Sequence, residues 1–208
     1  MKPYWNWKPQ ELYLSIKADI IQSMHHKRYS RNPILLPLSL FYAMGIALRD
    51  LAFRWGINTI MDYEMPIIGV GNLSTGGSGK TPHTYYLMNH LTKRGLPTAY
   101  LSRGYGRKST GYREVSIQSK ADKIGDEALL AKHRFPQSRV VVSESRSQAI
   151  PDVYHGRPAH QVTLLDDAFQ HRSIKPGLQI LLTRYDCLFC DDFLLPYGRL
   201  REFRSGYH

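Results

Sequence analysis

The stretch of sequence that decides the fold is residues 65–81, MPIIGVGNLSTGGSGKT. Residues 67–70 are apolar and predict a short buried strand, which breaks into a glycine-rich loop. Lys80 and Thr81 follow the glycines, and residues 82–91 have the composition of a helix with proline in its first turn. Strand, glycine-rich loop, Lys-Thr and helix are together the parts of a phosphate-binding loop.

Each part of this loop suits the binding of a nucleotide's phosphate groups. Gly76, Gly77 and Gly79 let backbone N–H groups turn inward onto phosphate oxygens. The N-terminus of the following helix adds partial positive charge at the same place. Lys80 is placed to reach the outer phosphates, and the Thr81 hydroxyl is placed to bind Mg²⁺.

One position departs from the strict loop pattern, because Ser74 stands where glycine is expected. Serine resists positive φ more than glycine does, so the bare motif match is weakened there. The alternative is a glycine-rich turn that merely joins a strand to a helix. That alternative requires the lysine and the hydroxyl to follow the glycines by coincidence.

The composition limits the classes of protein to consider. The 208 residues suffice for one α/β domain with an appended segment, and the net charge of +11 predicts an anionic partner. Nucleic acid, acidic lipid and a phosphorylated substrate all fit that charge. The two cysteines, Cys187 and Cys190, are too few for a disulfide-rich secreted domain, and no second pair completes a zinc site. They are expected to be reduced thiols.

The most apolar stretch precedes the loop and forms the end of a first unit, residues 1–60. Residues 33–48 carry no charge. This uncharged stretch is shorter than the ~20 residues that span a bilayer. On a helix, apolar side chains fall on one face at spacings of three and four residues. They are Phe41, Met44, Leu48, Leu51 and Trp55. This pattern fits a helix lying in a membrane interface, or an ordinary helix packed on the domain or on another subunit.

Charged residues follow several predicted strands of a second unit, residues 61–208. Arg103 ends the strand predicted at 97–102, and Asp166 and Asp167 end the strand predicted at 161–167. The carboxyl end of a strand is where an open α/β sheet binds ligands and where a phosphate-loop protein places its Mg²⁺-ordering aspartate. Asp126 opens a further helix, either as a capping residue or as a general base.

With these pieces in order, the chain resembles the tetraacyldisaccharide 4'-kinases, the lipid A 4'-kinases of Gram-negative bacteria. The resemblance covers residues 33–205 and includes the leucine-rich stretch that precedes the domain. The family pattern itself has Ser or Thr at the position of Ser74. The matching blocks are VGNLS at 70–74, GGSGKT at 76–81, SRGY at 102–105, GDE at 125–127, DDAFQH at 166–171, LLP at 194–196 and LRE at 200–202.

The resemblance implies an activity, cofactors, partners and a location. The activity is transfer of the ATP γ-phosphoryl group to the 4'-hydroxyl of a tetraacylated glucosamine disaccharide 1-phosphate, with Mg²⁺ required. The partners are ATP, this lipid A precursor and the inner-membrane surface, with no nucleic acid. The location is peripheral, on the cytoplasmic face of the inner membrane. An acyl-chain substrate also favours membrane association for the helix within residues 33–57.

The resemblance also assigns roles to single residues. Asp126 is implied as the base that takes the hydroxyl proton, and Lys80 as the catalytic lysine on the β- and γ-phosphates. The phosphate loop consists of Ser74, Thr75, Gly76, Gly77, Ser78, Gly79, Lys80 and Thr81. The residues implied for Mg²⁺ are Thr81, Asp166, Asp167, Gln170 and Glu202. Those implied for phosphate or sugar contact are Arg103, Arg146 and His171.

The implied fold is a phosphate-loop, three-layer α/β sandwich with a mostly parallel sheet, preceded by the membrane-associated helix. Members of the family continue into a second lobe with a histidine that partners the base, whereas this sequence ends at His208. The resemblance therefore predicts an N-terminal part, or a truncated frame, that binds ATP and turns over weakly.

Two other classes of function remain open from the residues. The first is a membrane-associated phosphate-loop ATPase or switch without a small-molecule acceptor, which leaves Asp126 unexplained. The second is a basic nucleic-acid-binding protein, but many of its aromatic residues fall in apolar runs instead of lining a basic face.

Overall fold

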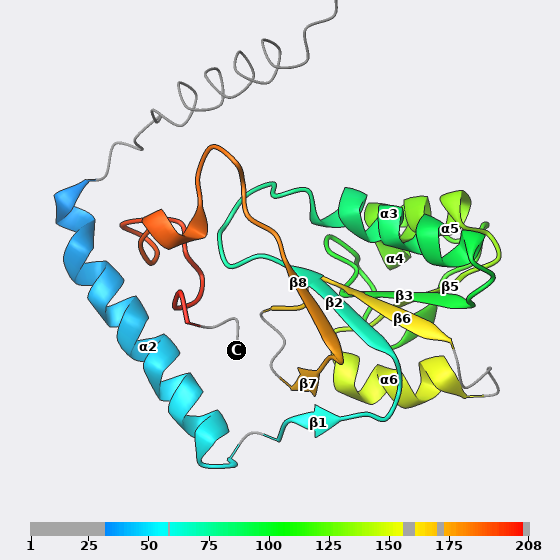
Figure 1. Ribbon diagram of the computed structural model, residues 1–208, viewed down its shortest axis with the longest axis horizontal. Helices are drawn as coiled ribbons and strands as arrows, with labels where there is room; N and C mark the ends of the chain where they lie inside the picture. Colours follow the sequence, from blue (N-terminus) through cyan, green and yellow to red (C-terminus); the bar gives the residue numbers. More distant parts are fainter. Residues whose placement is uncertain (1–31, 58, 156–160, 170–172, 206–208) are drawn as a thin grey trace, which may run out of the picture.

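The computed structural model describes residues 32–57, 59–155, 161–169 and 173–205, and Figure 1 shows how its elements are arranged. Residues 1–31 of the predicted first unit, and the predicted site residues Gln170 and His171, lie outside this description. The helices are η1 (Pro33–Leu35), α2 (Leu36–Arg54), α3 (Lys80–Lys93), α4 (Ala121–Ile124), α5 (Asp126–Arg134), α6 (Arg146–Tyr154) and η2 (Phe189–Asp191). The strands are β1 (Met61–Asp62), β2 (Ile67–Gly71), β3 (Thr98–Ser102), β4 (Arg113–Glu114), β5 (Arg139–Val142), β6 (Val162–Asp166), β7 (Ile174–Lys175) and β8 (Leu178–Leu181).

The central sheet has six strands in the order β4-β5-β3-β6-β2-β8. All of its pairings are parallel except that of β4 with β5, which is antiparallel. The interior strands β3 and β6 are buried along their whole length, as expected for apolar strands of a parallel sheet covered on both faces. A separate pair, β1 with β7, is also parallel.

Helices cover both faces of this sheet. Ala149, Ile150 and Val153 of α6 pack against Leu101 and Leu165 in one buried cluster. On the other face, a second cluster joins α3, α4 and α5 to the sheet, and Figure 1 shows the two layers of helices on opposite sides. Its helical members are Tyr85, Met88, Ile124, Ala128 and Ala131. The predicted three-layer α/β sandwich is confirmed.

The topology brings the predicted site residues to one edge of the sheet. In the register of β2 with β6, Val70 lies opposite Asp166, so the loop after β2 begins beside the two aspartates. β3 pairs with β6 on the other side, and its carboxyl end leads into Arg103. Because parallel strands share a carboxyl edge, segments far apart in the sequence meet there.

Helix α2 lies to one side of the sandwich (Figure 1). Ser39 and Ile46 are its buried residues, whereas the side chains of the predicted apolar face are largely exposed, including Phe41 at 68% and Leu48 at 60%. By length and composition, the helical stretch Pro33–Arg54 could cross a membrane, and its mean hydropathy is 1.6. Signal sequences and the core helices of soluble proteins meet the same criterion.

The segment that follows β8 packs against the phosphate loop. Ser74 pairs with Leu200 in an isolated antiparallel bridge, and the amide of Thr75 donates to the carbonyl of Arg199 over 2.8 Å. Leu73 and Leu200 are buried in a small third cluster with Phe169. Cys187 and Cys190 of this segment are both free thiols, as predicted.

Candidate nucleotide-binding site

The loop between β2 and α3 has the backbone conformation of a phosphate-binding loop. Gly76 and Gly79 have φ angles of 105° and 77°, which a residue with a Cβ adopts at a cost. Gly79 is the N-cap of α3, so the positive end of that helix faces the loop. Ser74 is not strained, because Asp167 is the sole non-glycine residue with positive φ in the part of the chain that the structure describes.

Lys80 begins helix α3 and extends toward the carboxyl edge of the sheet. Its Nζ donates to Asn72 Oδ1 over 3.2 Å and lies 3.6 Å from Asp167 Oδ1. The ammonium group is therefore held by oxygen atoms directly beside the glycine-rich loop. That is the place from which a lysine reaches the outer phosphates of a bound nucleotide.

Thr81 faces two carboxylates. Its Oγ1 lies 3.3 Å from Asp166 Oδ2 and 3.5 Å from Glu127 Oε1. Asp166 is buried, and it accepts hydrogen bonds from the Tyr100 hydroxyl at 2.8 Å and from the backbone amide of Asp167 at 2.9 Å. Burial raises the pKa of the Asp166 carboxyl above its ordinary value. The pKa of Glu127 is likewise raised, first by burial and then by the charge of Asp166.

The second aspartate is held in an uncommon backbone conformation. Asp167 has a φ of 52°, and its carbonyl oxygen accepts a hydrogen bond of 3.0 Å from Arg146 Nη1. Arg146 is 2% exposed, and burial lowers the pKa of its guanidinium to about 10. The predicted contact of Arg146 with substrate is therefore not supported by its position, since its side chain lies beneath the aspartates and supports the backbone of Asp167.

Asp126 is the first residue of α5 and is exposed. It sits next to Glu127, which faces Thr81, so the N-terminus of α5 adjoins the carboxylate cluster. A Cβ built on Gly125 would lie 2.9 Å from the carbonyl oxygen of Tyr105, so only glycine lets the turn after β3 pack here. This turn also carries Arg103, which is exposed.

The consecutive residues Arg201 and Glu202 contact different parts of the molecule. Arg201 Nη2 donates to Asn72 Oδ1 over 2.8 Å and lies 3.5 Å from Asp167 Oδ1, so it shares both acceptors with Lys80. Glu202 points elsewhere: it is buried and forms a two-pronged ion pair with Arg49 of α2. The structure thus brings Lys80, Thr81, Asp166 and Asp167 together and turns Glu202 toward the outer helix.

Sequence reasoning missed four side chains that the structure brings into this site. They are Asn72, Tyr100, Glu127 and Arg201. Asn72 follows strand β2 directly, and its position at the carboxyl end of a strand was the available signal. Tyr100 lies inside a buried strand and gave no such signal.

The residues present fit a nucleotide and Mg²⁺. Mg²⁺ prefers oxygen ligands and is usually held by one or two carboxylates together with phosphate oxygens. Thr81, Asp166 and Glu127 offer such oxygens, while the described residues contain no preformed group of three or more His, Cys, Asp or Glu side chains for a metal. Ser78 Oγ in the loop is buried and lacks a hydrogen-bond partner among the described residues, as a phosphate contact would require.

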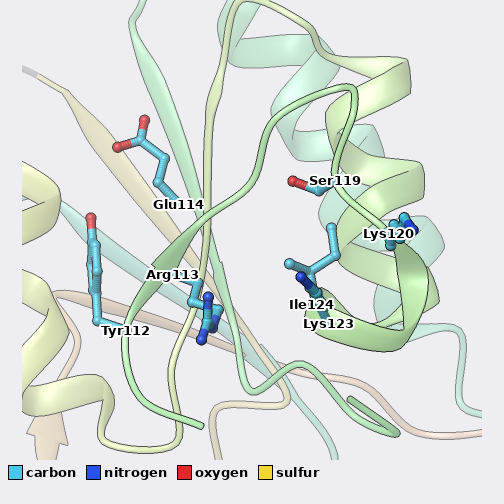
Figure 2. A pocket seen from close by; sticks show the side chains of 7 residues that line it. All are labelled: Tyr112, Arg113, Glu114, Ser119, Lys120, Lys123 and Ile124. Atoms are coloured by element: carbon cyan, nitrogen blue, oxygen red, sulfur yellow. The ribbon is translucent and has the colours of Figure 1, made fainter. Parts of the chain in front are cut away.

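A cleft and a pocket lie at or near the carboxyl edge. The narrow cleft beside the loop is lined by Ser74, Thr75 and Ser78 and also by Arg184 and Arg199. The pocket has a volume of ≈ 340 Å³ and lies at the outer edge of the sheet (Figure 2). Its charged lining residues are Arg113, Glu114, Lys120 and Lys123, and none of the predicted site residues lines it.

The fold and this loop define a phosphate-loop nucleotide-binding protein. Residues 31–208 match the family profile of LpxK, described as tetraacyldisaccharide-1-P 4'-kinase. The chain belongs to this family.

Similar proteins agree with this assignment. The chain is 47% identical over 173 residues to the tetraacyldisaccharide 4'-kinase of Bacteroides thetaiotaomicron, covering 83% of this chain and 45% of that protein. It is 44% identical to the enzyme of the same name from Flavobacterium johnsoniae, covering 83% of this chain and 51% of that protein. The chain spans about half the length of the curated relatives it matches.

A solved structure shares the fold. It is described as the "apo" form of LpxK from Aquifex aeolicus in complex with ATP. The TM-score is 0.70 and the identity 39%, over 81% of this chain and 53% of that one.

Proposed function

We propose that this chain binds ATP with Mg²⁺ and takes part in phosphoryl transfer to the 4'-hydroxyl of a tetraacyldisaccharide 1-phosphate, the acceptor in the family's name. One observation carries the proposal. Lys80, Thr81 and the aspartates 166 and 167 converge at the end of a glycine-rich loop. Thr81 contacts Asp166 at 3.3 Å, the amide of Asp167 contacts Asp166 at 2.9 Å, and Lys80 lies 3.6 Å from Asp167. The fold and family membership support the same conclusion.

Binding of the triphosphate is assigned to the loop and the N-terminus of α3. Backbone N–H groups of residues 74–79 and the helix dipole favour anionic oxygens at this point. Lys80, whose ammonium group contacts Asn72 and Asp167, would bind the β- and γ-phosphates of the nucleotide. Phosphoryl transfer depends mainly on such positioning and charge neutralisation.

Mg²⁺, when bound, neutralises charge on the phosphates during transfer. Its protein ligands are proposed to be Thr81 and Asp166, with Glu127 added by its 3.5 Å contact to Thr81 Oγ1. Asp167 faces Lys80 and Arg201 and orients these two cations. Glu202 is bound by Arg49 and is not among the proposed ligands. Gln170 remains a prediction from the sequence.

Asp126 is proposed as the base that accepts the proton of the acceptor hydroxyl. It is exposed at the start of α5, and its neighbour Glu127 reaches Thr81, so a hydroxyl held near the γ-phosphate has a carboxylate beside it. Arg103 is exposed at the same edge and is assigned to phosphate or sugar contact. His171 keeps the same assignment as a prediction from the sequence.

Helix α2 is proposed to lie on the cytoplasmic face of the inner membrane. Its predicted apolar face points away from the protein while the opposite face packs on the domain, which supports a helix lying in a membrane interface. The net charge of +11 favours attraction to anionic lipid headgroups. An acceptor with four acyl chains is located in the same membrane.

The experiment has two parts, both on the purified full chain. Calorimetry measures ATP binding with and without Mg²⁺, and radiolabelled transfer to the lipid disaccharide measures the reaction in parallel with Lys80→Ala and Asp126→Ala. Absence of ATP binding by folded protein would overturn the proposal. Hydrolysis of ATP at a rate unaffected by the disaccharide would instead favour an ATPase or switch without a small-molecule acceptor.

A further inference from the structure

One face of α2 is attached to the same segment that pairs with the phosphate loop. Ser39 Oγ donates to the carbonyl of Leu194 over 3.0 Å, and the Tyr42 hydroxyl donates to the carbonyl of Arg201 over 3.1 Å. Arg49 Nη1 donates to Glu202 Oε1 over 2.9 Å, with a second contact from Nη2 to Oε2. These helix residues are spaced so that they lie on one face, opposite the exposed apolar residues.

The ion pair is the strongest of these attachments. Glu202 is buried and its two oxygens receive two guanidinium N–H groups, the geometry that fixes both partners most firmly. The Arg49 side chain is partly shielded, and it also contacts Asp50 at 3.2 Å. Loss of the guanidinium leaves a buried carboxylate without its partner, so the segment around Glu202 must shift or open.

The residue before Glu202 leads into the site. The amide of Arg201 donates to the carbonyl of Leu73 over 2.8 Å, which pairs this segment with the start of the phosphate loop. The guanidinium of Arg201 holds Asn72 at 2.8 Å and approaches Asp167, the two acceptors that also hold Lys80. A continuous set of contacts therefore runs from α2 to the phosphate-binding lysine.

We infer that Arg49 is a positioning residue for the phosphate site. Through Glu202, it holds the 199–202 segment against residues 73–75, and Arg201 then fixes Asn72 and Asp167 in place for Lys80. The inference rests on the proposed function for its consequence on ATP affinity. Because such coupling is reciprocal, a bound nucleotide also stabilises the docking of α2 against this segment.

The test compares Arg49→Ala with Arg54→Ala in the full chain. Arg54 is exposed in the last turn of the same helix, so the control removes the same charge. We expect Arg49→Ala to weaken ATP binding about twofold to thirtyfold, the range of energetic coupling through intervening contacts. Arg54→Ala should bind ATP as the parent does. Equal ATP affinity in parent and Arg49→Ala would overturn the inference.

Two further variants separate positioning from a general loss of stability. Arg49→Lys keeps the charge but not the two-pronged contact, and it should bind ATP with intermediate affinity. The double variant Arg49→Ala/Arg201→Ala should bind ATP no more weakly than Arg201→Ala alone, because both changes act on one set of contacts. A fully additive loss in the double variant would contradict action through Arg201.

A second measurement does not depend on nucleotide. Amide hydrogen exchange in Arg49→Ala should be faster at Thr75 and Arg201, whose N–H groups pair the two segments, and unchanged in β5. Unchanged exchange at these two amides would also overturn the inference. If the parent itself binds no ATP, the proposed function fails, and exchange alone decides the role of Arg49.

Discussion

The hydroxyl of Thr81 lies 3.3 Å from the carboxylate of Asp166, although 85 residues separate them in the chain. The contact joins the first turn of α3 to the end of β6 and closes the carboxyl edge of the sheet. Asp166 is fixed in turn by the Tyr100 hydroxyl from β3. The geometry that a cation would use is therefore set by the sheet itself, which is a rigid support.

The first prediction concerns Lys80. Lys80→Ala removes the cation that lies between Asn72 and Asp167 and should weaken ATP binding about tenfold to a hundredfold, the value of one hydrogen bond to a charged group. Calorimetry measures the dissociation constant. Lys93→Ala, an exposed position at the other end of α3, is the matched control and should leave the affinity unchanged. An equal loss of ATP affinity in both variants would indicate nonspecific attraction between ATP and the positive charge of the chain.

The second prediction concerns Glu127, whose pKa is raised by burial and by Asp166. A raised carboxyl pKa means that the folded state holds the proton more tightly, so stability is greatest below the ordinary pKa and declines as pH rises through the raised one. Glu127→Gln should therefore increase the free energy of unfolding at neutral pH by at most about 1 kcal/mol, a typical size for partly exposed charges. The gain should disappear near pH 4.

Urea unfolding at the two pH values measures this difference. Glu64→Gln, at an exposed position on the approach to β2, is the control and should show no pH-dependent gain. The same Glu127→Gln protein should bind ATP less tightly when Mg²⁺ is present and with parental affinity when it is absent. A loss of affinity without Mg²⁺ would place Glu127 in direct contact with the nucleotide instead.

The third prediction concerns Arg146, which is buried below Asp167. Arg146→Met removes the donor to the Asp167 carbonyl and the positive charge beside two aspartates, so the free energy of unfolding should fall by about 1.5–3 kcal/mol. Urea unfolding measures this loss, with the exposed Arg113→Met as control. Unchanged stability together with lost phosphate binding would support the contact with phosphate or sugar that the resemblance implied.

Local features of the site were predictable from the sequence. The strand at 67–71, the glycines and Lys80 lie within one short stretch, and Asp166 ends an apolar strand. Their physical causes act over a few residues, so the residues alone indicate them. The three-layer sandwich was implied by the resemblance to the tetraacyldisaccharide 4'-kinases, because its sheet pairs strands that lie far apart in the chain.

Other features depend on distant contacts. Glu202 pairs with Arg49, which is 153 residues away. Nothing in the sequence near Glu202 shows whether its carboxylate binds an arginine or a metal ion. At the start of α5, consecutive side chains point in directions about 100° apart, so the sequence alone did not determine that Glu127 faces Thr81. The phosphate loop was predictable, whereas the side chains that complete the site required the fold.

The fourth prediction concerns the outer face of α2. Phe41 and Leu48 are 68% and 60% exposed, and they lie on the side of the helix opposite the buried Ser39 and Ile46. Replacing both by aspartate removes apolar area and adds negative charge near anionic lipid. Because burial of each such side chain contributes about 1.5–3 kcal/mol, binding to vesicles should weaken more than about tenfold. Cosedimentation with phosphatidylglycerol-containing vesicles measures the partition of the chain.

The matched control for this surface is Leu130→Asp on α5, which places a carboxylate at an apolar position with a comparable exposed fraction, 58%. It should leave vesicle binding unchanged, because the proposed membrane surface lies on α2 alone. Both variants should retain ATP binding, which shows that the sandwich is folded. If the double variant binds vesicles as the parent does, the outer face of α2 does not dock on lipid.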